Sequence, residues 1–104
     1  MRARRDPDGS EEFLRPVQAE YLSRLPGQTS EFAALWLQAR AGDQAALDRL
    51  RDGVHRIAGN AGTLGFPDLS RVARSAELAL EHGGPTTEAE SAIQSLFETM
   101  RATQ

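Results

Sequence analysis

The chain has 104 residues, of which 39% are apolar and 26% are charged, and its formal charge is -3. This length fits a single domain with one core, and the absence of cysteine excludes disulfide bonds, thiolate zinc sites and cysteine nucleophiles. No apolar run approaches the ~18 residues of a membrane span, and no signal peptide is recognisable. The acidic balance of charge argues against binding to nucleic acid, and the absence of cysteine fits a reducing cytoplasm. We therefore expect a cytoplasmic protein that binds neither membrane nor nucleic acid.

Helical periodicity extends over most of the chain, and the alternation typical of strands is missing. Residues 1–9 are predicted to form a disordered tail, and residues 10–104 a helical domain. The first helix is expected to run from its N-cap, Ser10, to Leu25, because the Pro26-Gly27 pair would end it. An apolar stripe with a spacing of four residues would be its buried face: Phe13, Val17, Tyr21 and Leu25.

A second helix is expected from its cap, Ser30, to Gly42, and a third, longer helix from its cap, Asp43, to about Leu64, closed by Gly65. The second would bury Phe32, Leu35, Trp36 and Ala39. The third has an apolar seam with alternating spacings of three and four residues, which is typical of helices packed at a shallow angle. This seam consists of Leu47, Leu50, Val54, Ile57, Ala61 and Leu64.

Two more helices complete the chain. Pro67 would open the fourth at its first position, and Gly83-Gly84-Pro85 would end it. A capping box at residues 87–90 would start the fifth. Their buried faces would be Leu69, Val72, Ala73, Ala76 and Leu80, and Ala89, Ile93, Leu96, Phe97 and Met100. Short loops join the last four helices, so the predicted fold is all-α: an antiparallel up-down-up-down four-helix bundle with an additional N-terminal helix laid across it.

His55 draws attention because of its place on the third helix. It follows the apolar Val54 and therefore points about 100° away from the seam, toward solvent. Small residues are stacked beyond it at positions three, four and seven further on: Ala58, Gly59 and Gly62. Together with Gly53, the two glycines cost this helix about 3 kcal/mol. Either they permit close helix packing, or they leave a bare patch on which another protein approaches the ring.

Residues 49–74 carry a local charge of +3, from five arginines against two aspartates, within an otherwise acidic chain. An anionic partner should therefore meet the protein near His55.

The stretch from His55 to Phe66 resembles the signature of histidine-containing phosphotransfer (HPt) domains, His-x-Leu-Lys-Gly-x-Ala-x-x-Leu-Gly. The residues that match directly are His55, Gly59, Ala61, Leu64 and Gly65. The resemblance implies a four-helix phosphocarrier in which His55 is phosphorylated and Gly59 makes room for the phosphoryl group. Ala58 stands where the family has a lysine that neutralises the phosphoryl oxygens, and Arg51 and Arg56 are the candidate substitutes.

The partners implied by the resemblance are a response-regulator receiver domain and a histidine kinase or hybrid kinase. We expect no cofactor or metal in this chain, because Mg²⁺ would be held by the receiver. Nothing in the sequence resembles the ATP-binding site of a kinase. Two alternatives remain: a binding module that docks on a receiver and blocks it without chemistry, and the phosphoacceptor domain of a larger chemotaxis-type kinase.

Overall fold

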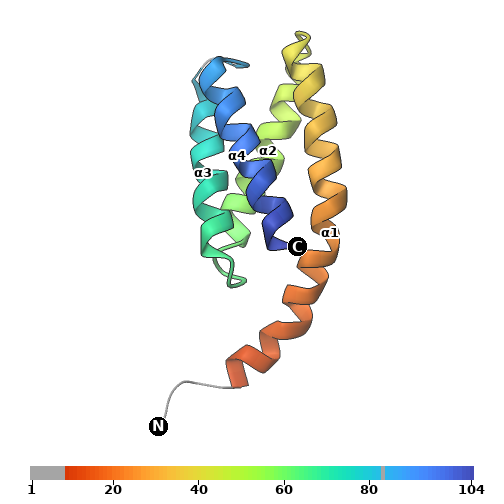
Figure 1. Ribbon diagram of the computed structural model, residues 1–104, viewed down its shortest axis with the longest axis vertical. Helices are drawn as coiled ribbons and strands as arrows, with labels where there is room; N and C mark the ends of the chain where they lie inside the picture. Colours follow the sequence, from red (N-terminus) through yellow and green to blue (C-terminus); the bar gives the residue numbers. More distant parts are fainter. Residues whose placement is uncertain (1–8, 83) are drawn as a thin grey trace.

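The computed structural model describes residues 9–82 and 84–104, with side chains from Leu14 onward. It consists of four helices: α1 (Gly9–Arg40), α2 (Gln44–Asn60), α3 (Pro67–Glu81) and α4 (Thr87–Thr103). The helices run alternately up and down, and each packs against its two neighbours around a closed ring, α1 also meeting α4 (Figure 1). The predicted antiparallel four-helix bundle is confirmed.

The additional N-terminal helix is a wrong prediction, because the first two expected helices are one continuous helix, α1. Pro26 and Gly27 lie inside it, where a proline costs about 3 kcal/mol and a glycine about 1 kcal/mol. The helix continues because its buried seam continues: Leu25, Thr29 and Phe32 are all buried. Thr29 Oγ1 also donates to the Leu25 carbonyl at 2.8 Å. Pro26 and Gly27 lie on the exposed face, so packing outweighs their local cost.

Other details of α1 follow from this continuity. The helix begins at Gly9, so neither Ser10 nor Ser30 is an N-cap, and the rest of the predicted tail lies outside the described residues. The N-terminal part of α1 projects beyond the end of the bundle (Figure 1). There Val17 is 46% exposed instead of buried, and Tyr21 is half-buried and stacks on Phe66 with 5.8 Å between ring centroids.

Hydrogen bonds at both ends of α2 define where this helix begins and ends. Its N-cap is Asp43, as predicted, whose side chain accepts the Ala46 N–H at 3.1 Å. The helix ends at Asn60, four residues before the expected end. The chain then continues through a tight turn over 61–65, in which the Phe66 N–H donates to the Ala61 carbonyl at 2.8 Å. Gly65, with a φ of 97°, closes this Schellman motif as expected.

The starts of the last two helices differ in how well they were predicted. Pro67 opens α3 at its first turn, as expected. The cap of α4 is Thr86, whose hydroxyl accepts the Ala89 N–H at 3.0 Å, so the expected capping box at residues 87–90 is wrong by one residue. With the cap at Thr86, Glu90 is still in the first turn of α4, and its carboxylate accepts the indole N–H of Trp36 at 2.9 Å.

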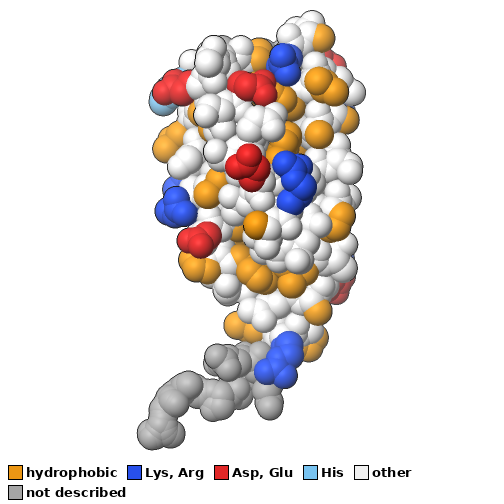
Figure 2. All heavy atoms as spheres, viewed as in Figure 1, with side chains coloured by type: hydrophobic (Ala, Val, Ile, Leu, Met, Phe, Trp, Pro, Cys, Tyr) orange, Lys and Arg blue, Asp and Glu red, His pale blue; other side chains and the backbone are white. Residues whose placement is uncertain are grey.

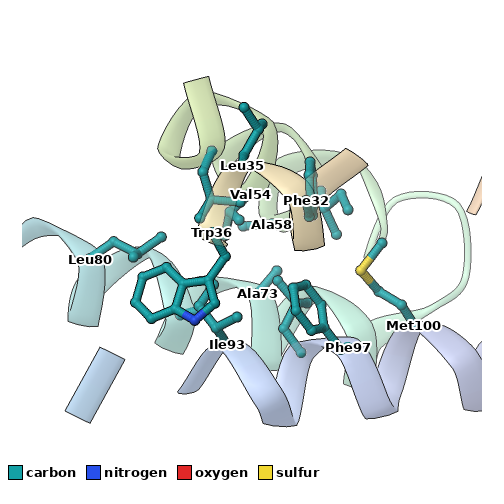
Figure 3. Packing of buried hydrophobic residues seen from close by; sticks show 14 of the residues in the cluster. Phe32, Leu35, Trp36, Val54, Ala58, Ala73, Leu80, Ile93, Phe97 and Met100 are labelled. Atoms are coloured by element: carbon teal, nitrogen blue, oxygen red, sulfur yellow. The ribbon is translucent and has the colours of Figure 1, made fainter. Parts of the chain in front are cut away.

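Side chains from all four helices form the core (Figure 3). Among the residues whose side chains are described, the expected buried faces are confirmed, except that Leu64 and Val72, like Tyr21, are half-buried and Val17 is exposed. The side chain of Phe13 lies outside the described part of the chain. The largest fully buried side chains are Leu25, Leu50, Val54, Ile57, Leu69, Leu80, Ile93, Leu96 and Met100. Acidic and basic side chains alternate on the face shown in Figure 2, without a large patch of one sign. Over the described residues, no helix has the length and apolarity needed to cross a membrane.

Candidate functional site

His55 lies near the middle of α2, on the side away from the core. Its neighbours in sequence on the seam, Val54 and Ile57, are buried and fix the rotation of the helix. The side chain of His55 is 70% exposed. Its Nδ1 atom lies 2.5 Å from Oε2 of Glu77, on the adjacent helix α3, and the Glu77 side chain is only 16% exposed. The two helices therefore present the ring to solvent and hold one of its two nitrogens.

The contact with Glu77 determines what the ring can do. An ionised carboxylate only accepts hydrogen bonds, so opposite such a carboxylate Nδ1 of His55 keeps the ring proton and donates a hydrogen bond to Oε2 of Glu77. In the neutral ring, Nε2 then has the lone pair, on the side that faces away from Glu77. The site thus offers a fixed, exposed nitrogen nucleophile.

The three glycines of the His55 region have different surroundings. A Cβ atom on Gly53 would lie 2.5 Å from the ring of Phe32 in α1, so this glycine permits close helix packing. A Cβ atom on Gly62 would lie 3.4 Å from the hydroxyl of Ser70, an ordinary contact. Around Gly59 the space is open, and the residue is exposed one turn from His55. Gly53 therefore permits close helix packing, as one interpretation predicted, and Gly59 leaves an open surface beside the ring; the approach of another protein to this surface stays a prediction.

Ala58 does not belong to the exposed patch, contrary to the expectation from spacing. It is 2% exposed, and its side chain points into the core beside Val54 (Figure 3). The reason is the helical angle: at 100° per residue, position 58 lies only 40° from position 54 but 60° from position 55. Gly59 lies 40° from His55 on the side opposite to Ala58, and Gly62 is nearly in line with His55. Both glycines are exposed.

The two arginines proposed as substitutes for the family lysine lie elsewhere on α2. Arg51 is one turn before His55, and its Nη1 atom lies 3.5 Å from the carboxylate of Asp48 in the same helix. Arg56 is exposed and follows His55, 100° further around the helix. Among the described residues, neither forms a hydrogen bond or ion pair with His55.

Two residues of α3, Glu77 and Arg74, contact α2 at or near His55 and were not predicted from the sequence. An Nη2 atom of Arg74 donates to the Ala58 carbonyl at 3.3 Å. A signal for both was available, because α2 and α3 form a hairpin around Phe66. His55 and Glu77 are each eleven residues from Phe66, and position 58 and Arg74 are each eight residues from it. Antiparallel helices bring such equidistant positions together, so the turn would have predicted the partners of His55.

The fold and the exposed ring define an all-helical bundle with an accessible imidazole on α2. The chain belongs to the Hpt domain family, because the family model described as "Hpt domain" matches residues 17–103. Domains of this family are phosphotransfer modules of phosphorelays, without a kinase domain of their own, and they generally partner receiver domains. No curated protein and no solved structure matches the chain.

Proposed function

We propose that the protein accepts a phosphoryl group on Nε2 of His55 and exchanges it with the aspartate of a response-regulator receiver domain. One observation carries the proposal: the exposed His55 ring has Nδ1 bound to Glu77, which leaves Nε2 free. The open space beside Gly59, one turn further along α2, provides room for the phosphoryl group and for the partner's backbone.

The transfer needs little from this chain. The lone pair of Nε2 attacks the phosphorus of an aspartyl phosphate, the P–N bond forms, and the P–O bond to the aspartate breaks. The electron pair leaves with the aspartate as its carboxylate. The proton stays on Nδ1, so the phosphorylated ring is cationic and the Glu77 carboxylate faces it. Position and charge are thus the main contributions of this protein, as is general for phosphoryl transfer.

The receiver domain supplies the remaining chemistry in this proposal. Its acidic pocket would hold Mg²⁺, and this chain would contribute no cofactor. It would dock on the exposed surfaces of α2 and α3 around His55 and Gly59 through a modest, transient interface. A histidine kinase or hybrid kinase would provide the phosphoryl group at the start of the sequence of transfers.

Incubation with a phosphorylated receiver domain tests the proposal. The expected result is a label on His55 that is labile in acid and stable in base, as for a phosphoramidate. His55→Gln should abolish the label without changing the circular dichroism spectrum. His82→Gln is a matched control, because His82 is the other histidine of the chain and lies at the exposed C-terminal end of α3. A label on His82, or one that survives in His55→Gln, contradicts the proposal.

A second function is favoured by one observation, the alanine at position 58, which supplies no cation to a phosphoryl group. The domain would then bind a receiver and block it without chemistry. Equal affinity of the wild type and His55→Gln for the receiver, with no label on either, would select this function.

A further inference from the structure

Arg74 is the arginine of α3 that reaches across to α2 near His55. Its Nη2 atom donates to the Ala58 carbonyl at 3.3 Å, one turn of α2 beyond the phosphoacceptor position. Arg74 also precedes Glu77 by three residues, so the two positions are neighbours about one turn apart on α3. Glu77 holds Nδ1 of His55, and Arg74 contacts α2 about one turn further along, at the Ala58 carbonyl.

The guanidinium of Arg74 is available for a stronger acceptor. The Ala58 carbonyl also accepts a shorter hydrogen bond, of 2.6 Å, from the hydroxyl of Ser70, so it stays satisfied if Arg74 moves. Within the described part of the chain, Arg74 forms no ion pair with a carboxylate, whereas Arg71 lies 3.6 Å from Asp68. A guanidinium has five N–H donors and binds phosphate oxygens through charge-assisted hydrogen bonds.

A phosphoryl group on Nε2 of His55 would bring two negative charges to this surface. Glu77 opposes them, and the buried Ala58 offers no cation. We propose that Arg74 binds the phosphoryl oxygens of phosphorylated His55 and is the cation of this site, in place of Arg51 or Arg56. The inference rests on the proposed function and adds to it a phosphoryl-binding residue on α3 instead of α2.

The test uses potassium phosphoramidate as a small phosphodonor, which labels an accessible imidazole without a protein partner. The initial rate of labelling is followed by intact mass for the wild type, Arg74→Gln, Arg74→Lys and Arg71→Gln. Arg71 is the matched control, because it lies on α3 and lines the same open surface hollow as Arg74. Its replacement by glutamine also removes one positive charge.

We expect Arg74→Gln to slow labelling about five-fold, the size of one charged hydrogen bond at an exposed site, and Arg71→Gln to change it less than about two-fold. Arg74→Lys should retain most of the rate, since it keeps the charge. In ³¹P NMR, the titration of the phosphoryl group should move to higher pH in Arg74→Gln only, because a nearby cation favours the dianion.

Equal effects of Arg74→Gln and Arg71→Gln would overturn the inference, since the arginines would then act only through net charge. The same holds if Arg74→Lys is as slow as Arg74→Gln, because the loss would then come from packing. Absence of label on His55 in the wild type would instead overturn the proposed function, so the two failures are distinguishable.

Discussion

Two carboxylates of this protein accept an N–H group from an aromatic ring, on different sides of the bundle. Glu77 of α3 accepts Nδ1–H of His55 on α2, and Glu90 of α4 accepts Nε1–H of Trp36 on α1. Both carboxylates are half-buried, although the contact of Glu77, at 2.5 Å, is shorter than that of Glu90, at 2.9 Å. The rings differ: Trp36 is 3% exposed within the core, whereas His55 lies in solvent.

The comparison indicates that the same kind of contact has different consequences for an indole and for an imidazole. An indole has no second nitrogen, so the bond to Glu90 only satisfies a donor at the edge of the core. Gln94, Trp36 and Arg40 all lower the pKa of Glu90, in that order of effect, and its burial opposes them. An imidazole held in the same way keeps one free nitrogen, and the contact then fixes a nucleophile.

Removal of Glu77 should have the largest effect on phosphotransfer. We expect Glu77→Ala to slow the labelling of His55 by about ten-fold or more, because the ring loses its orientation and the carboxylate that faces the cationic phosphoimidazole. Glu90→Ala is the matched control and should leave the labelling rate of the folded protein unchanged. Similar rates for both variants would show that the contact of Glu77 is only structural.

The next effect concerns Gly53, on the packed side of α2. Gly53→Ala places a methyl group against the buried Phe32 ring, and such overpacking costs about 1–3 kcal/mol. The gain in helix propensity, about 1 kcal/mol, offsets only part of this cost. Urea denaturation should therefore show a lower free energy of unfolding, and a more stable variant would contradict the close approach of α1 and α2.

Gly59, on the open side of the same helix, should respond in the opposite direction. Gly59→Ala meets no neighbour and should raise the free energy of unfolding by about 1 kcal/mol. The added methyl group should at the same time slow transfer from a phosphorylated receiver about two-fold or more, because it narrows the space for the partner. A variant that is stabilised but transfers at the wild-type rate would exclude a role for this open surface.

The smallest effect is expected at acid pH. The pKa of Glu90 is lower in the folded protein than its usual value of 4.5, so its contribution to stability is complete above that pH and is lost as the pH falls through the folded pKa. Glu90→Gln should therefore lose less stability than the wild type in thermal unfolding between pH 4.5 and pH 3. Parallel curves for the two proteins would contradict the lowered pKa.

Most of the bundle could be predicted from the sequence, because the buried seams have helical spacing. The strong signals for helix ends at Asp43, Gly65 and Pro67 agree with the limits of these seams. The prediction failed where a local signal and the seam disagree: Pro26-Gly27 indicates an end, but Leu25, Thr29 and Phe32 remain buried on both sides. The spacing within one helix predicted the exposure of His55 and Gly59, which is confirmed. Glu77 and Arg74 were not predicted, because these residues meet α2 only through the pairing of two helices.

The length of the turn between α2 and α3 determines which residues of the two helices face each other. His55 and Glu77 face each other because each is eleven residues from Phe66, so one extra residue between the helices would slide the carboxylate away from the imidazole. The ring would then be free to exchange its tautomers, and either nitrogen could take the phosphoryl group. If His55 is the phosphoacceptor, as proposed, the length of this short connection determines which of its nitrogens reacts.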